Sequence, residues 1–244
     1  IPFNGVHAPY QVPEAYTKGY PQLKGNRQKL AGMLSAVDEA IGKIVSTIDK
    51  AGLRENTLII FSSDNGAPPP GDNTPLRDFK ATVYEGGIKA AAFVNWPGHV
   101  HSGTTITEPM HIIDWYPTLI NLAGGKINQT TTVDGKDVWP MITQNQKSPH
   151  DAILTVSTRG PVISAIRIDN WKLILLAADT SQLKTKAFNK YESVALFNLL
   201  DDPSETKNLA LKYPERVILM QKRLNEMLKD AVPSRAKDAA EELQ

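Results

Sequence analysis

Hard oxygen side chains stand together at Asp64 and Asn65, in the stretch SSDNG that covers residues 62–66. A carboxylate beside an amide carbonyl offers ligands that suit calcium or magnesium better than zinc or copper. Calcium takes about six to eight oxygens, so the other ligands must come from elsewhere. Asp-Asn-Gly is also ordinary turn chemistry, because Asp and Asn bond their own backbone and Gly permits a positive φ. The motif alone leaves both interpretations open.

Basic residues follow at Arg77 and Lys80, in a loop rich in Pro and Gly that leads to YEGG at residues 84–87. Cations beside a metal-binding strand end can hold an anionic group such as a phosphate or sulfate ester. A solvated charged loop is the alternative interpretation of the same spacing.

The histidines alone do not identify a catalytic or metal site. His7 has no partner nearby in the sequence, and His99, His101, His111 and His150 lack metal-ligand spacing. His111 and Asp114 lie three residues apart on an expected helix, which favours a structural hydrogen bond. The chain contains no cysteine, so within it a disulfide, a thiolate metal site and a cysteine nucleophile are excluded. Neither a GxSxG turn nor a P-loop nor a GxGxxG stretch occurs.

The elements that must position these residues follow an α/β order. Apolar residues recur at three- and four-residue steps from Gln28 to Gly52 and predict an amphipathic helix. A buried strand at 58–61 then ends at Asp64, and ligands in open α/β sheets bind beyond such strand ends. A second strand at 88–98 and a short helix at 111–125 follow, whereas residues 8–27 predict an irregular loop. We expect a mostly parallel sheet flanked by helices.

The last third of the sequence has a different pattern. Residues 165–175 and 195–200 predict strands of a small antiparallel sheet, and residues 214–231 predict a final amphipathic helix. We therefore expect two domains, a catalytic α/β part over 1–150 and a smaller α+β part over 151–244.

Composition limits the class of protein. The chain has 244 residues, of which 41% are apolar and 22% charged, and its formal net charge is +1. This composition is typical of a soluble globular protein and gives no basic field for nucleic acid. No apolar run is long enough to span a bilayer. Asn128 begins an N-glycosylation triplet, which matters only in a secreted protein.

Taken together, these pieces resemble a known family. Residues 62–66 followed by PLRDFKATVYEGGIKAAAFVNWPG strongly resemble the type I sulfatases of the alkaline phosphatase superfamily. VHAPYQVP, HIIDWYPTLINLAG, DGKDVWPMI and LFNLLDDPSETKNLA match the same family in the same order. VHAPYQVPEAY and DGKDVW are most similar to the arylsulfatase B group, which acts on N-acetylgalactosamine 4-sulfate.

The resemblance implies roles for four residues. Asp64 and Asn65 would be two calcium ligands, Lys80 would contact the substrate sulfate, and His7 would face the sulfate and protonate the leaving group. The sequence departs from the family at Ala67 and Asp78, where Gly is usual, and at Tyr84, where Trp is usual. Asp78 adds a negative charge near Lys80.

The family nucleophile, a formylglycine made from cysteine in Cys-x-Pro-x-Arg, is not encoded in this segment. Residues 231–235, AVPSR, echo that motif by coincidence. The chain therefore resembles the C-terminal part of a sulfatase, completed by an N-terminal portion in the same or a separate chain. A truncated relative without catalysis is the other explanation.

Three functions follow as hypotheses. The first is a secreted or lysosomal calcium-dependent hydrolase of sulfate esters, acting on sulfated sugars or aryl sulfates. The second is a non-catalytic protein that binds sulfated glycans or belongs to a secreted matrix. The third is a phosphate or phosphonate ester hydrolase of the same superfamily.

Overall fold

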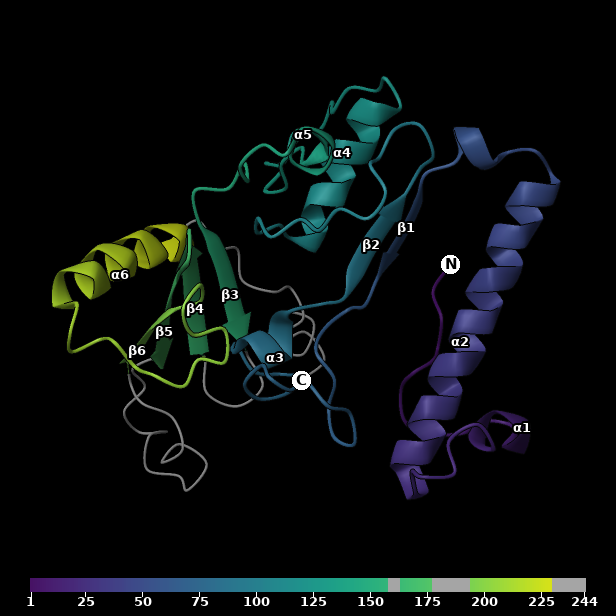
Figure 1. The fold of residues 1–244 in the computed structure, drawn as a ribbon. Coiled ribbons are helices and arrows are strands. Elements are labelled where there is room, and N and C mark those ends of the chain that lie inside the picture. The colour runs from purple at the N-terminus through teal and green to yellow at the C-terminus, as the bar shows by residue number, and fades with distance from the viewer. Residues whose placement is uncertain (158–162, 177–193, 230–244) are drawn as a thin grey trace, which may run out of the picture. The chain divides into compact units, whose positions relative to one another are not determined.

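The computed structural model describes residues 1–157, 163–176 and 194–229 (Figure 1). The chain divides into two compact units, Ile1–Pro149 and His150–Gln244. The AVPSR stretch at residues 231–235 lies outside the described residues. No helix in the described ranges combines the length and the apolar character that crossing a bilayer requires.

The first unit begins with two helices, α1 (Glu14–Thr17) and α2 (Gly25–Lys50). Helix α2 confirms the predicted periodic helix, and Gly52 follows it with a φ of 67°, which favours glycine. Helix α1 corrects the expectation of an irregular loop over 8–27. It packs against α2 at Gly32, where a β-carbon would lie 3.3 Å from the carbonyl carbon of Tyr16. One helical turn is too short to show a periodic pattern.

A two-stranded sheet follows the short 3-10 helix η1 (Arg54–Asn56). Strand β1 (Ile59–Ser62) pairs with β2 (Ala92–Asn95), and the helix α3 (Glu85–Ile88) precedes β2. The pair is antiparallel, with Phe61 opposite Phe93. The expected parallel neighbour of β1 is therefore not found among the described strands. Residues 63–91 lead from the tip of β1 to Ala92, which lies opposite Ser62 at that same tip, so β2 runs back along β1. A parallel partner would need a crossover to the start of the strand.

The regular elements in the rest of this unit are helices. The 3-10 helix η2 (Ile112–Asp114) runs into α4 (Trp115–Leu122), which confirms the predicted short helix, and α5 (Trp139–Gln144) follows. Buried Val138, Met141 and Ile142 form a small apolar cluster against which Val94 of β2 packs. The buried hydroxyl oxygen of Thr118 accepts a hydrogen bond of 3.0 Å from the N–H of Val138, which joins α4 to the start of α5.

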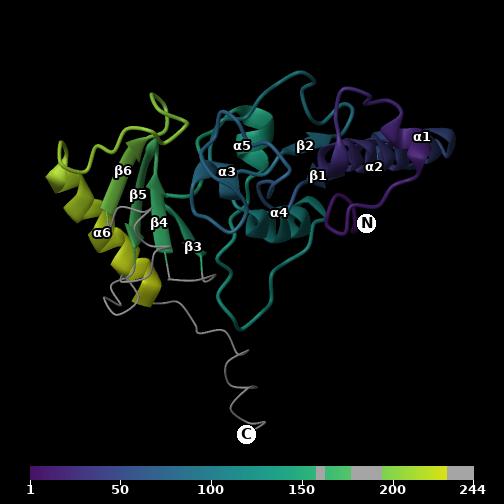
Figure 2. The ribbon, with the colours of Figure 1, turned by 90° about the horizontal axis from the view of Figure 1, so that it is seen from below.

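The second unit is a four-stranded sheet covered by one helix (Figure 2). The strands β3 (Ile153–Ser157), β4 (Ile163–Ile168), β5 (Trp171–Leu176) and β6 (Val194–Asn198) pair in that order, all antiparallel. Helix α6 (Pro214–Lys229) packs its buried Met220 and Leu224 on Ile166, Leu173 and Leu196. The predicted antiparallel sheet and final helix are confirmed, and β3 is an addition to them.

A buried ion pair lies in the second unit. The Lys172 ammonium on β5 lies 2.9 Å from the Glu205 carboxylate, and their side chains are 2% and 0% exposed. Two opposite charges removed from water in this way stabilise each other, and removing one of them from a buried pair is costly. The pair therefore holds the loop after β6 to β5.

Candidate functional site

Asp64 and Asn65 lie directly after β1, at the strand end where the sequence pattern places them. Two backbone hydrogen bonds fix this turn to the segment before β2. The N–H of Ser63 donates to Ala91 (2.8 Å), and the N–H of Gly66 donates to Gly87 (2.9 Å). The Asp64 side chain is exposed and Asn65 is half-buried, so their oxygens are accessible to a cation.

Close backbone contacts explain the glycines around this turn. A β-carbon on Gly66 would lie 1.8 Å from the carbonyl oxygen of Gly86, and one on Gly86 would lie 2.3 Å from that of Arg77. Only glycine fits at either position without moving backbone. The turn after β1, the loop at Arg77 and the start of α3 therefore form one packed structure.

Asn73 organises the loop between the turn and Lys80. Its Oδ1 accepts from the N–H of Ala67 (3.0 Å), and its Nδ2 donates to the carbonyl of Ala67 (2.8 Å) and to that of Asp78 (3.0 Å). The carbonyl of Ala67 also accepts from the N–H of Lys80 at 3.3 Å. One side chain thus joins both ends of the loop and fixes the backbone of half-buried Lys80 beside the end of the turn.

Asp78 lies where the family usually has glycine, and its positive φ of 66° explains that preference for glycine. This left-handed conformation favours glycine, but Asp tolerates it when its side chain bonds locally. The Oδ1 of Asp78 accepts from the N–H of Phe79 at 3.1 Å. The substitution therefore preserves the path of the loop toward Lys80.

The sequence pattern alone does not reveal the support beneath the loop. Val83, Tyr84 and Glu85 are buried. The guanidinium of Arg77 lies 4.1 Å from the centroid of the Tyr84 ring, a cation–π contact. Of the two cations predicted to hold an anion, Arg77 thus contributes to packing within the protein. The YEGG signal could have pointed to this support, since two adjacent glycines often mark close backbone packing.

His7 lies on an exposed segment that is tied to the same loop. Its Nδ1 is 2.8 Å from the carbonyl oxygen of Ala8. A carbonyl only accepts, so this contact needs a proton on Nδ1 and leaves Nε2 to accept, or to donate when the ring is charged. Tyr10 donates to the carbonyl of Pro69 (3.4 Å), and Arg27 donates to that of Pro70 (3.0 Å). These bonds attach the His7 segment and the start of α2 to the loop after Asp64.

The structure brings the four predicted site residues onto linked segments without direct bonds among them. Within the described ranges, no group of three or more His, Cys, Asp or Glu could hold a metal ion. Asp64 and Asn65 fit part of a calcium site by their oxygen chemistry, and the remaining ligands are needed from other residues or water.

His111 and Asp114 are structural, as predicted. The Oδ2 of Asp114 accepts from the N–H of His111 at 2.6 Å, and the Nδ1 of His111 accepts from the N–H of Ile113 at 3.3 Å. Asp114 is buried and also accepts from the N–H of Lys136 at 2.9 Å. Both side chains cap the start of the helix. Asn128 lies exposed in the loop between α4 and α5, where its side chain is accessible.

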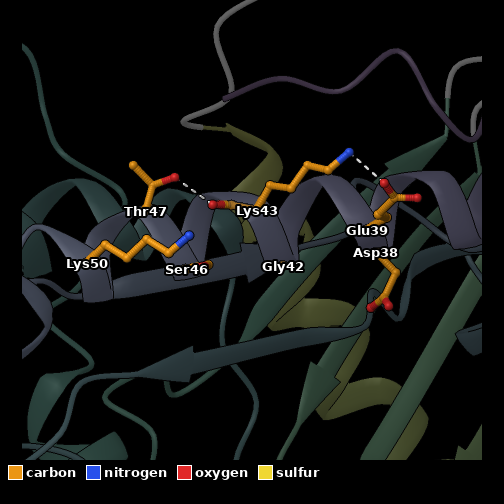
Figure 3. Close-up of a pocket in the computed structure, with 7 residues that line it drawn as sticks. All are labelled: Asp38, Glu39, Gly42, Lys43, Ser46, Thr47 and Lys50. Carbon is orange, nitrogen blue, oxygen red and sulfur yellow. Dashed lines mark hydrogen bonds and ion pairs between the residues drawn. The ribbon is translucent and has the colours of Figure 1, made fainter.

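A shallow surface depression lies along α2, away from the predicted site residues (Figure 3). It is an open depression of about 490 Å³. Its lining comes from a single helix face: Asp38, Glu39, Gly42, Lys43, Ser46, Thr47 and Lys50. None of the predicted site residues contributes to it.

The comparisons with known proteins define the class. The family described as Sulfatase matches residues 1–125, about half of the chain. The family described as N-sulphoglucosamine sulphohydrolase, C-terminal, matches residues 78–232. This chain belongs to the sulfatase family.

Individual relatives agree. Arylsulfatase J of Mus musculus is 36% identical over 96% of this chain and 46% of its own length. Arylsulfatase A of Homo sapiens is 31% identical over 78% of this chain and 42% of its own length. The chain thus spans about half the length of the curated relatives it matches. The narrower resemblance to the arylsulfatase B group stays a prediction.

Solved structures support the fold. The structure of Ps i-CgsB is 30% identical, with a TM-score of 0.82 over 92% of this chain and 48% of that one. The putative sulfatase yidJ from Bacteroides fragilis has a TM-score of 0.71 at 21% identity, a likeness of fold alone. The predicted fold class, part of an alkaline-phosphatase-like α/β protein with a small antiparallel sheet, is confirmed.

Proposed function

We propose that this chain is part of a calcium-dependent sulfatase that hydrolyses sulfate esters of sugars or aryl alcohols. The observation that carries the proposal is the loop joined by Asn73. The chain belongs to the sulfatase family, and hydrogen bonds to the backbone of this loop connect the oxygen pair Asp64 and Asn65 to the cation Lys80.

Asp64 and Asn65 are proposed as calcium ligands. Their hard oxygens lie side by side on a turn that hydrogen bonds hold in place, and the sulfatase family is generally metal-dependent. A bound calcium ion supplies Lewis-acid neutralisation of sulfate oxygens. In this proposal the two residues form one side of the site, and the other ligands come from outside residues 1–244.

Lys80 and His7 are proposed to act on the ester. Lys80 binds a sulfate oxygen and opposes the negative charge that develops there. The leaving oxygen takes a proton from Nε2 of charged His7 as the S–O bond breaks, because Nδ1 is already directed at the carbonyl of Ala8. Histidine suits this step because it is the side chain that most often transfers a proton as a general acid or base. The products are an alcohol and sulfate, with water supplying the added oxygen and protons.

Asn73 is proposed as a positioning residue. It contacts neither metal nor substrate in this account, but its three bonds to Ala67 and Asp78 fix where the backbone of Lys80 lies. A catalytic cation must be placed within fractions of an ångström to be effective.

A sulfated carbohydrate is the proposed substrate class. One neighbouring structure, 30% identical to this chain, is that of Ps i-CgsB in complex with k-i-k-neocarrahexaose.

By the same family relationship we assign residues 1–150 to the catalytic domain and 151–244 to a smaller C-terminal part. We further propose that the protein is secreted or delivered to the lysosome and that exposed Asn128 is glycosylated.

The test compares three ligands on native protein, meaning the molecule or complex in which these residues occur in cells. A 4-nitrophenyl sulfate, the matching phosphate and a sulfated oligosaccharide are each incubated with and without calcium. We expect sulfate release that calcium supports. Turnover of the phosphate alone would favour a phosphatase, and glycan retention without turnover would favour a binding protein; either result contradicts the proposal.

A further inference from the structure

Phe79 is a large apolar side chain that stays 38% exposed immediately before Lys80. Single exposed apolar residues are common on protein surfaces, so exposure alone assigns Phe79 no role. Its place in the chain is more informative. Phe79 and Lys80 are consecutive residues joined by a trans peptide bond, which sets their Cα atoms about 3.8 Å apart. A ligand of Lys80 that is larger than a bare sulfate ion can therefore reach the neighbouring side chain.

The backbone of Phe79 is fixed on both sides. Its N–H donates to the Oδ1 of Asp78 at 3.1 Å. Its carbonyl oxygen accepts from the N–H of Thr82 at 3.2 Å and from the hydroxyl of Thr82 at 2.9 Å. A β-carbon on Gly87 would lie 2.6 Å from the same carbonyl oxygen, so the start of α3 packs directly against it. The ring of Phe79 is therefore carried by backbone whose position the surrounding contacts determine.

The residues before Phe79 are engaged with the protein. The guanidinium of Arg77 lies 4.1 Å from the centroid of the Tyr84 ring. The carbonyl of Asp78 accepts from Asn73 at 3.0 Å, and its side chain bonds the backbone of Phe79. Within this ordered loop, Phe79 presents an uncharged ring to its surroundings beside the cation proposed to bind sulfate. An apolar surface on fixed backbone limits the conformational freedom that is lost when a ligand binds.

The chemistry of the ring defines what can pack on it. An aromatic ring contacts another ring in an offset-stacked or edge-to-face arrangement. A pyranose carries C–H groups on its faces and makes a similar apolar contact, while its hydroxyls stay in water. A second sulfate or a carboxylate placed against Phe79 would lose water without gaining a hydrogen bond, which is costly. Phe79 therefore suits a ring whose contacting face carries no charge.

We propose that Phe79 is a specificity-determining residue that packs against the ring of the leaving alcohol when Lys80 holds the sulfate. The inference rests on the proposed function, in which Lys80 binds sulfate, and it adds the substrate feature that lies next to the reacting bond. The favoured substrate is a sulfate ester of a sugar or aryl ring with an uncharged face. An ester of a short acyclic alcohol lacks the surface that Phe79 recognises.

Two anions without a cleavable ester test this contact apart from catalysis. Benzenesulfonate carries a ring on its sulfonate and methanesulfonate carries one methyl group, whereas their charge is the same. In calorimetric titrations of the native protein with calcium, wild type should bind benzenesulfonate about 10-fold more tightly, because apolar contacts of this size discriminate ligands by factors of that order. Phe79→Ala should abolish the difference and leave methanesulfonate affinity unchanged.

Three results of the titrations would overturn the proposal. The first is wild-type protein without a preference for benzenesulfonate. The second is an equal preference in wild type and Phe79→Ala. The third is a parallel loss of both sulfonates in Phe79→Ala, which would mean that Phe79 supports the position of Lys80 and does not contact the ring.

Turnover of 4-nitrophenyl sulfate gives a second readout. Phe79→Ala should lower kcat/KM by about 10-fold, and Phe79→Tyr should recover most of that loss because it keeps the ring. Leu53→Ala is the control and should match wild type, since Leu53 is 55% exposed and lies before β1, away from the strand end that leads to Asp64. Equal losses in Phe79→Ala and Phe79→Tyr would contradict a ring contact.

The failure of this inference and that of the proposed function give different results. Absence of hydrolysis with the preference for benzenesulfonate intact would contradict the proposed function alone. Hydrolysis that Phe79→Ala leaves unaffected would contradict the role of Phe79 alone.

Discussion

Asn73 pairs with the backbone of Ala67 through both ends of its amide, accepting from the N–H at 3.0 Å and donating to the carbonyl at 2.8 Å. The same carbonyl accepts from the N–H of Lys80. Asn73 therefore supports the direct bond between the segment after Asp64 and the backbone of Lys80, the cation proposed to bind sulfate.

Replacing Asn73 tests that link. In the native protein Asn73→Ala should lower kcat by about 10- to 100-fold, because a small displacement of a catalytic group has effects of that size. KM should change less, and Asn73→Gln should recover little because its longer side chain cannot make the same bonds. Steady-state kinetics on a sulfate ester measures both. Asp72→Asn, on the same loop, is the control and should behave as wild type; equal losses in both variants would argue against positioning by Asn73.

Lys80 should matter far more than a neighbouring lysine. Lys80→Ala should reduce kcat/KM for sulfate esters by about 100- to 1,000-fold, as expected when one charge-stabilising donor is lost. Lys89→Ala removes an exposed lysine nine positions later and should leave kcat/KM unchanged. Activity of the Lys80 variant close to that of wild type would remove Lys80 from the site.

The calcium ligands can be tested without turnover. Asp64→Asn keeps the size of the side chain and removes its charge, so calcium affinity should fall by about 10- to 100-fold or more. Calcium that binds only the folded protein at about 100 times its Kd should add roughly 2.7 kcal/mol to the free energy of unfolding. Calorimetric titration and thermal melts with and without chelator measure the two effects. Identical calcium binding by wild type and variant would refute this ligand.

The buried pair in the second unit predicts a difference in stability between two ion pairs. Lys172→Met leaves Glu205 buried without its cation and should cost about 3–5 kcal/mol. Arg223→Met breaks the partly exposed pair of Arg223 with Asp151, at 2.8 Å, and should cost about 0–1 kcal/mol. Urea unfolding of each variant gives the comparison. Similar small costs for both would mean that the Lys172 pair is not needed for folding.

The hydrogen bonds of Glu39 with Lys43 and Tyr16 predict a shifted titration of its carboxyl group. Hydrogen bonding from Lys43, and then from Tyr16, lowers the pKa of the Glu39 carboxyl below its ordinary value of 4.5. The folded pKa lies below the unfolded one, so this link stabilises fully above pH 4.5 and is lost as pH falls through the lower folded value. Carbon NMR of Glu39 should show a midpoint below 4.5, raised by Lys43→Met and unaffected by Lys50→Met. An ordinary midpoint in wild type would contradict the link.

Much of the fold could be predicted because single elements leave local patterns. Apolar residues from Leu30 to Ile48 recur with helical periodicity, and the apolar run before Ser62 predicts a strand whose tip is Asp64. The His111–Asp114 bond could be predicted because the side chain three residues after the capping residue of a helix can reach back to that residue's N–H.

The remaining features depend on contacts between distant segments. Asn73 bonds Ala67 only after the loop has closed, and Arg77 stacks on Tyr84 only because Gly86 lets the backbones meet. The direction of the β1–β2 pairing likewise depends on the path between the strands. Local sequence patterns do not encode such contacts between distant segments, so these contacts could not be predicted from the sequence.

The most direct measurement is sulfate release from a sulfated oligosaccharide by native protein, followed by ion chromatography, before chelation, after it, and after calcium is restored. We predict release that stops on chelation, returns with calcium, and is greatly reduced by Asp64→Asn under the same conditions. Release that is insensitive to calcium and to Asp64→Asn, or no release by folded native protein with calcium present, would contradict the account.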